Sequence, residues 1–299
     1  MGRLRFVVAA LLVVAAAAAV GAYREGLDGA TLTGAPSGGP CRLGWEKPEH
    51  VGSLPGRRKE VSGFVASAGR RNLAWMVRDS GNPATLYSFA VDEDGQVRSR
   101  EFAVPGSTNG DWEDVAYTQD AAGHGHLWIL DNINRHTAPK TIWEVAEPRS
   151  GDNRTARLLA RYLWRYPEGD GNHDTETLLM MGGHLVVVSK TTPSWAYVFD
   201  RPLDADLLNI PRLLGELPGP KLVLGSTTAN GRLLLTSSTR TDTVYVADLT
   251  RGWTGTAPVF EAQMPAAQRE AGDFFPYDGC DIVLVDEAEN VWRLRNDRL

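Results

Sequence analysis

The chain has little cysteine, and this excludes several classes of protein. Among its 299 residues there are only two cysteines, Cys41 and Cys280. Two are too few for a disulfide-rich mini-fold or for a zinc site built on four cysteines. The sequence also contains neither the Walker A phosphate loop nor the G-x-G-x-x-G dinucleotide pattern. Nothing in it therefore predicts a nucleotide cofactor of the common kinds.

Positive charge is also scarce. The 31 Lys and Arg residues face 37 Asp and Glu residues, and the formal net charge is −6. A protein that binds nucleic acid usually carries a basic face, so we expect no nucleic-acid partner. With 42% hydrophobic residues, the chain can still bury a sizeable core. We expect a monomer whose partner is a small molecule or another extracellular ligand.

The N-terminus has the pattern of a secretory signal. Arg3 and Arg5 precede an unbroken apolar run over residues 6–20, and the small residues Gly21 and Ala22 follow. This order predicts a signal peptide over residues 1–22, with cleavage near Ala22 and a secreted product. The alternative is an uncleaved anchor, but the run is shorter than the roughly 20 residues that span a membrane. We therefore expect no transmembrane span after cleavage.

The remainder divides into a short spacer and one domain. Residues 23–40 are rich in Gly, Pro, Thr and Ser, which is typical of a flexible spacer, and residues 41–299 form the domain. In an exported chain Cys41 and Cys280 can form a disulfide that encloses almost the whole domain. The alternative is two unrelated buried thiols.

The domain carries an all-β pattern that repeats. Helix signals are weak, whereas short apolar or alternating runs recur between Gly, Asn, Asp and Pro turns. The runs align in a repeat of roughly 45–60 residues, within the range of β-propeller blades. We predict a single β-propeller of five four-stranded blades, with six as the alternative. The five units begin at Ser62, Glu113, Glu176, Ser226 and Ala271.

The last unit contains only three strands. Residues 41–60 are available to supply the fourth, so we expect an N-terminal strand to complete the C-terminal blade. Closure of this kind removes exposed sheet edges. A bond between Cys41 and Cys280 would lock the same junction.

Acidic residues fall at equivalent places in the repeat. The start of strand one and the end of strand two of each blade lie at the same mouth of the central channel, because the two strands are antiparallel. Such a ring of carboxylates could supply the oxygen ligands of Ca²⁺. The alternative is that these acids cap strand ends or pair with Arg and Lys. The predicted metal ligands are Glu113, Asp131, Glu176 and Glu270, and the predicted ligand-binding residues are Asp79, Asn82, Trp112, His173 and Lys190.

A series of short motifs resembles one known family. They are Val61-Ser62-Gly63-Phe64, Arg78-Asp79-Ser80-Gly81-Asn82, Asp111-Trp112-Glu113-Asp114-Val115-Ala116, Glu147-Pro148 and Asp174-Thr175-Glu176. This order resembles exported bacterial β-propellers of an actinomycete type, with an S-G…D-S-G-N…D-W-E-D-I-A…E-P…D-x-E pattern, loosely labelled phytase-like or esterase-like. The resemblance is good over residues 60–190 and weak elsewhere. It implies an exported propeller with an acidic face, and a label based on fold does not assign an activity.

The sequence departs from this family at two acidic positions. The loop at residues 131–135 has Asn-Ile-Asn where relatives carry a glycine and a further acid, and residues 270–273 match loosely. Both changes remove acidic ligands. We expect an exported propeller whose acidic mouth binds a ligand, with Ca²⁺ as the candidate cofactor and no assigned catalytic residue. The alternative is a Ca²⁺-dependent phosphoester or ester hydrolase that uses the same mouth.

Overall fold

The structure is a computed structural model, and it describes most of the chain after residue 43. The described ranges are residues 44–54, 60–91, 97–133, 139–149, 151–217, 222–227, 232–237, 243–248, 258–264, 269–276, 279–286 and 288–296. The predicted signal peptide, the spacer and Cys41 lie outside these ranges. Within them the regular elements are all strands. The described residues contain no helix that is long and apolar enough to cross a membrane.

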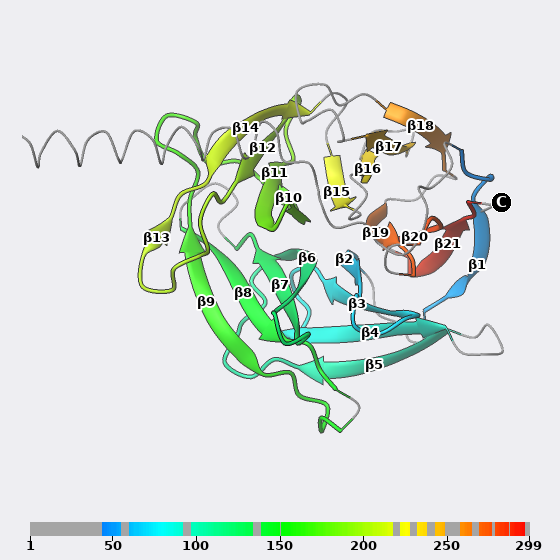
Figure 1. Ribbon diagram of the computed structural model, residues 1–299, viewed down its shortest axis with the longest axis horizontal. Coiled ribbons are helices and arrows are strands. Elements are labelled where there is room, and N and C mark those ends of the chain that lie inside the picture. The colour runs from blue at the N-terminus through cyan, green and yellow to red at the C-terminus, as the bar shows by residue number, and fades with distance from the viewer. Residues whose placement is uncertain are drawn as a thin grey trace, which may run out of the picture.

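The strands of the described residues form five sheets around one axis (Figure 1). We number these sheets as blades 1 to 5 in chain order. Blade 1 contains β2 (Val61–Ala66), β3 (Leu73–Arg78), β4 (Thr85–Val91) and β5 (Val97–Ala103). Blade 2 contains β6 (Trp112–Gln119), β7 (Gly125–Asp131), β8 (Lys140–Ala146), β9 (Leu158–Trp164) and the short β13 (Leu208–Asn209). Blade 3 contains β10 (Thr175–Met181), β11 (His184–Ser189), β12 (Ser194–Val198) and β14 (Arg212–Leu217).

The last two blades follow the same plan. Blade 4 contains β15 (Leu222–Thr227), β16 (Arg232–Ser237), β17 (Thr243–Asp248) and β18 (Pro258–Gln263). Blade 5 contains β19 (Arg269–Phe274), β20 (Ile282–Asp286), β21 (Asn290–Leu294) and β1 (Glu49–Ser53). The innermost strands contact each other in the cyclic order β2, β6, β10, β15, β19 and back to β2. The ring is therefore closed, and the prediction of a single propeller is confirmed.

Blade 5 is completed by the N-terminal strand, as the sequence predicted. β1 pairs antiparallel with β21, from Glu49 opposite Arg293 to Ser53 opposite Asn290. Outside the sheet, the Glu46 amide donates to the carbonyl of Arg295 over 2.9 Å. The first and last described segments thus share one sheet, and the outer edge of β21 is covered.

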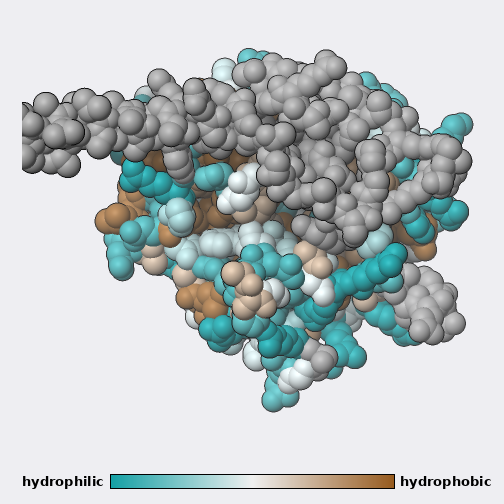
Figure 2. All heavy atoms as spheres, viewed as in Figure 1, coloured by the Kyte–Doolittle hydropathy of each residue, from teal (hydrophilic) through white to brown (hydrophobic). Residues whose placement is uncertain are grey.

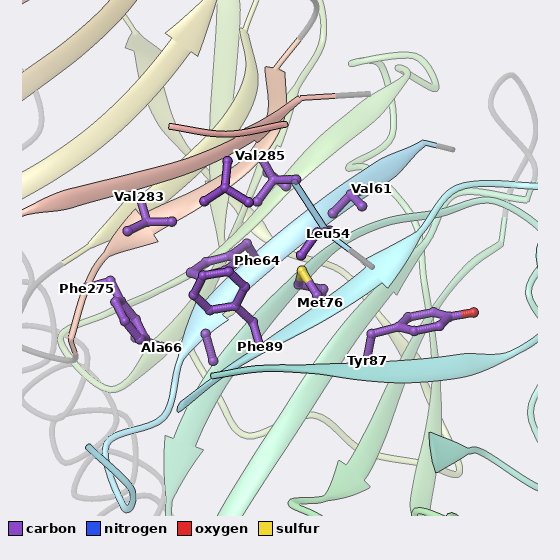
Figure 3. Packing of buried hydrophobic residues seen from close by; sticks show 13 residues of the cluster. Leu54, Val61, Phe64, Ala66, Met76, Tyr87, Phe89, Phe275, Val283 and Val285 are labelled. Atoms are coloured by element: carbon purple, nitrogen blue, oxygen red, sulfur yellow. The ribbon is translucent and has the colours of Figure 1, made fainter. Parts of the chain in front are cut away.

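The core is divided among the junctions between blades. At the junction of blades 1 and 5, Phe64, Phe89 and Phe275 meet edge to face, with ring centroids 5.2 to 6.1 Å apart (Figure 3). At the junction of blades 1 and 2, Trp75 and Trp112 are buried in one cluster. Large apolar side chains on alternating strand positions therefore hold neighbouring blades together, as closed propellers require.

Two elements differ from the sequence prediction. In blade 4 the innermost strand is β15 (Leu222–Thr227), whereas we expected a strand beginning at Ser226. The apolar residues before Ser226 form the strand, and the Ser/Thr run ends it. The second difference is β13, which pairs parallel with β9 at Leu208 and Asn209 and was not predicted. A two-residue strand leaves too short a pattern to detect.

β13 and the following segment carry much of the exposed apolar surface of the described residues. The space-filling view shows apolar atoms at the left edge of the molecule, over β13 (Figure 2). The exposed large apolar side chains of this segment are Leu207, Leu208, Ile210 and Leu213.

Candidate functional site

A β-bulge recurs at the second residue of every innermost strand. In each blade the pairing between strands one and two skips one residue on strand one. A bulge leaves one residue unpaired and re-aims its side chain. The skipped residues are Ser62, Glu113, Glu176, Val223 and Glu270, in blade order. The sequence had identified three of these positions, the glutamates, as equivalent.

The backbone around the bulge is fixed in the same way in three blades. The amide of the residue after strand two donates to the carbonyl of the residue before strand one. These bonds join Asp79 to Glu60 (3.0 Å), Asn132 to Asp111 (2.8 Å) and Lys190 to Asp174 (2.8 Å). Polar side chains at three sets of equivalent positions therefore gather at one mouth of the channel.

Five carboxylates come together there, and we call them the acid group. One triplet is Asp79, Asp111 and Glu113, the other is Glu113, Asp174 and Glu176, and within each triplet one oxygen per residue lies within 4.8 Å of the others. Glu113 belongs to both triplets. Glu113 and Glu176 are buried, whereas Asp79 and Asp174 are partly exposed. The acid group thus extends over blades 1, 2 and 3 and reaches the surface at its two ends.

Basic and amide side chains hold one end of the acid group. Lys190 Nζ lies 2.9 Å from Glu176 Oε2. Asn132 Nδ2 donates to Asp174 Oδ1 over 2.6 Å, and the fully buried Lys140 donates through Nζ to Asn132 Oδ1. The amide of Asn132 is therefore oriented by Lys140, and it in turn orients the carboxylate of Asp174.

Burial and mutual repulsion change the titration of Glu113. Desolvation, followed by the charges of Glu176, Asp111 and Asp79, raises the pKa of Glu113 to about 11, and Lys190 acts in the opposite direction. Carboxylates so close together cannot all ionise without a counter-charge. A cation among them would favour the ionised form, because metal ligands bind as carboxylates.

The carboxylates of Asp114 and Asp273 accept hydrogen bonds from backbone amides of two neighbouring blades. Asp114 accepts hydrogen bonds from the amides of Val115 and Leu178, both at 2.8 Å. Asp273 accepts from the amides of Phe274 (2.7 Å) and Ala66 (2.8 Å) in the same way. Each aspartate therefore joins its own innermost strand to that of the next blade. Burial raises the pKa of Asp114 well above its ordinary value, against these two backbone bonds.

Two predicted site residues have structural roles instead. Asp131 Oδ1 accepts from the amides of Asp111 (3.1 Å) and Ile133 (3.2 Å), and its Oδ2 accepts from Trp143 Nε1 (3.0 Å). Its carboxylate is buried and is no member of either triplet. Trp112 is 0% exposed, so it cannot form a surface for a ligand. Trp112 is held by packing at the junction of blades 1 and 2, whereas the carboxylate of Asp131 is engaged by donors of its own blade.

The other predicted residues lie near the mouth with different surroundings. Asn82 Nδ2 donates to the carbonyl of Asp79 over 3.1 Å and so shapes the loop that carries this acid. His173 is partly buried and lies edge to face on Tyr166, with ring centroids 5.1 Å apart. Glu270 occupies the bulge of β19, but its side chain lies outside the described residues.

Two members of the acid group, Asp111 and Asp174, are not among the predicted metal ligands. Asp111 and Asp174 stand two residues before Glu113 and Glu176, in the repeated pattern Asp-x-Glu. Residues i and i+2 of a strand lie on the same face. That repeat was the available signal, and it would have identified both aspartates.

Comparison with known proteins gives only a general likeness. No family model matches the chain, and no curated protein is significantly similar to it. Among solved structures, a gluconolactonase from Xanthomonas campestris has a TM-score of 0.41 and 13% identity, covering 88% of this chain and 99% of that one. A putative oxidoreductase (glucose dehydrogenase) from Thermus thermophilus has a TM-score of 0.47 and 9% identity, covering 84% and 100%. At these TM-scores and identities the likeness assigns no function to this chain.

Proposed function

We propose that the protein is an exported propeller which binds an extracellular small molecule through a Ca²⁺ ion held by the acid group. The observation that carries the proposal is the pair of carboxylate triplets that share Glu113. Ca²⁺ accepts six to eight oxygen ligands in flexible geometry, whereas Mg²⁺ needs a compact octahedron. Triplets of carboxylates contributed by neighbouring blades suit the larger ion.

The ligand would approach from the open side of the mouth. Asp79 and Asp174 are partly exposed, and each belongs to one triplet, so an ion bound by either triplet would reach solvent. Ligand oxygens would complete its coordination, and Lys190, whose side chain is 15% exposed, could contact an anionic group beside it. Hydroxyl, carboxylate and phosphate oxygens are all suitable partners for Ca²⁺.

Hydrolysis of a phosphoester or ester remains the alternative, and the basic residues give it less support. Such an enzyme needs cationic groups that hold the phosphate in addition to the metal. Arg78, the last residue of β3, is 4% exposed. Its Nη2 lies 2.5 Å from Glu289 Oε1, and its guanidinium lies 4.4 Å from the ring centroid of Tyr87. Arg78 is therefore held away from solvent, and of these two described basic residues Lys190 is the one that a phosphate could reach.

Thermal melting during a Ca²⁺ titration tests the metal site. We expect the wild-type melting temperature to rise with Ca²⁺ up to millimolar concentrations, because the ion binds the folded state. Glu113→Gln removes the carboxylate that both triplets share, so it should abolish the rise. Glu216→Gln is the matched control, since Glu216 is exposed on β14, and it should behave as wild type. A wild-type melting temperature that does not respond to Ca²⁺ would contradict the site.

Turnover of generic substrates separates the two candidate functions. A binding protein should hydrolyse neither p-nitrophenyl phosphate nor p-nitrophenyl acetate, with Ca²⁺ or with chelator. A hydrolase should turn over one of them with Ca²⁺ and lose that activity both in chelator and in Glu113→Gln. Activity of this second kind would replace the binding proposal with the enzymatic one.

A further inference from the structure

A cavity lies at the other end of β6 and β7 from the acid group. Its volume is about 1140 Å³, and it is bounded by turns of blades 1 and 2. The β6–β7 turn contributes Asp120 and His124, and the segment between β8 and β9 contributes Arg149, Asp152 and Arg157. Ligand-binding pockets usually have volumes of about 300–1,000 Å³, so the cavity is large enough for a small molecule.

One wall of the cavity is rigid and is built around Glu147. Its Oε1 accepts from Ser67 Oγ (2.6 Å) and Trp75 Nε1 (3.0 Å), and its Oε2 accepts from Tyr117 Oη (3.2 Å). Arg70 Nη2 lies 2.8 Å from Oε1. These hydrogen bonds lower the pKa of Glu147 against the effect of its burial, so this acid is ionised and fully engaged with the protein.

Gly125 shows how closely this wall is packed. A Cβ atom at Gly125 would lie 2.2 Å from Glu147 Oε2 and 2.6 Å from Tyr117 Oη. Any other residue would therefore displace the carboxylate from its donors. The glycine is required by the close approach of Glu147.

The other two acids of the cavity are also engaged by nearby donors. Asp120 Oδ1 accepts from the amides of Ala122 and His124, both at 2.8 Å, and its Oδ2 lies 3.0 Å from His124 Nδ1. Asp152 Oδ2 accepts from the amide of Arg149 over 2.6 Å. The acceptors of the cavity are thus largely occupied by the protein itself.

Two of the three arginines of the cavity are in the opposite situation, whereas Arg70 is paired with Glu147. Arg149 and Arg157 are exposed, and their guanidinium groups make no hydrogen bond or ion pair with any residue that the structure describes. Three arginines and three acids line the cavity, so their formal charges cancel. The guanidinium donors of Arg149 and Arg157 are nevertheless available, and arginine donors bind carboxylate and phosphate oxygens in paired geometry.

We propose that this cavity is a binding site for a small anionic molecule whose phosphate or carboxylate group is held by Arg149 and Arg157. It is separate from the acid group, which would bind a cation. The proposal does not depend on the proposed function, because none of its residues belongs to the acid group.

Calorimetric titration of metal-free protein with three matched sugars tests the proposal. Metal is removed by passage over a chelating resin, since a soluble chelator is itself a polyanion. Glucose 6-phosphate and glucuronate carry the two anionic groups on a similar sugar, and glucose is the neutral control. We expect at least one anionic sugar to bind and glucose to give no signal. Binding of the phosphate, the carboxylate or both supports the site and identifies which anion it selects.

Two double variants locate the binding. Arg149→Ala with Arg157→Ala should weaken binding about tenfold or more, because a charge-assisted hydrogen bond is worth about 1.5 kcal/mol or more. Arg71→Ala with Arg201→Ala removes the same charge at exposed positions outside the cavity and should change affinity less than about twofold. Thermal melting of both variants confirms that they are folded. The proposal is overturned if neither anion binds more tightly than glucose, or if both double variants weaken binding equally.

Discussion

Glu113 shows how one buried residue can determine the behaviour of a whole site. It occupies a bulge, belongs to both carboxylate triplets and is 2% exposed. In metal-free protein its position is unfavourable for a charged group, and with a bound cation the same position is favourable. The residue is therefore expected to reduce stability without metal and to link stability to metal concentration.

The stability of metal-free protein should fall as pH rises. Because the folded-state pKa of Glu113 is raised to about 11, the folded chain retains a proton that the unfolded chain releases near pH 4.3. The contribution to stability is full below the unfolded pKa and is progressively lost as pH increases towards the folded value. We expect melting temperatures measured from pH 5 to pH 9 to decline in wild type and to decline less in Glu113→Gln.

Controls isolate Glu113 from the other titrating groups. Glu216→Gln should retain the wild-type slope, and saturating Ca²⁺ should flatten the wild-type slope because it favours the ionised carboxylate. Equal slopes in wild type and Glu113→Gln would show that Glu113 ionises normally.

At the scale of the element, the innermost strands combine a repeated bulge with bonds to the next blade. Asp114 on β6 accepts the amide of Leu178 on β10, and Asp273 on β19 accepts the amide of Ala66 on β2. These aspartates join neighbouring strands that share no β-ladder. Their carboxylates therefore hold the innermost strands of neighbouring blades together around the channel.

Removing the Asp114 carboxylate should destabilise the whole propeller. Asp114→Ala leaves the buried amides of Val115 and Leu178 without their side-chain acceptor, and an unsatisfied buried donor costs about 1–3 kcal/mol. With two such donors, we expect the free energy of unfolding in urea to fall by about 2–6 kcal/mol. Asp114→Asn keeps an acceptor oxygen and should lose less. If the two variants were equally stable, the backbone bonds would not explain the burial of this acid.

The elements also show where sequence reasoning succeeds. The blade plan was predictable because strands longer than four residues leave runs of apolar residues between turns, and because the runs repeat. β13 was missed because two residues leave no pattern, and β15 was misplaced because Ser, Thr and Ala fit a strand as well as its end. The bulge could not be predicted, since one skipped residue changes the direction of a side chain without changing the composition.

The site was predictable only in part, because the direction of a side chain cannot be read from the sequence pattern. Glu113 and Glu176 were identified by their equivalent positions. Asp131 was expected beside them, but Trp143 Nε1 and two backbone amides engage its carboxylate. All three partners belong to the same blade as Asp131, and the repeat pattern does not specify which way a carboxylate at the end of a strand turns within its own blade.

On the scale of the whole molecule, closure depends on blade 5, and a disulfide should strengthen it. Trp45 Nε1 donates to the carbonyl of Cys280 over 2.6 Å. Cys41 lies outside the described residues, but it stands four residues before Trp45, and four residues span at most roughly 14 Å. The predicted pairing of Cys41 with Cys280 is compatible with this placement and remains a prediction.

Mass analysis without reductant tests the pairing directly. After alkylation of the unfolded chain we expect no modified cysteine unless reductant is added first. Reduction should lower the melting temperature, because closing so long a loop stabilises the fold by on the order of 4–5 kcal/mol in the chain-entropy model. Cys280→Ser should melt like the reduced wild type and should not respond to reductant. Two alkylated thiols in the untreated protein would refute the bond.

The pairing of β1 with β21 also sets the timing of folding. These strands lie at opposite ends of the described chain, so blade 5 cannot be completed until the residues of β21 are available. Contacts between segments so distant in sequence form slowly, because the loop between them must first be closed. A chain still under synthesis can therefore assemble blades 1 to 4 but leaves its sheet edges open. The ring is finished last, by the strand that was made first.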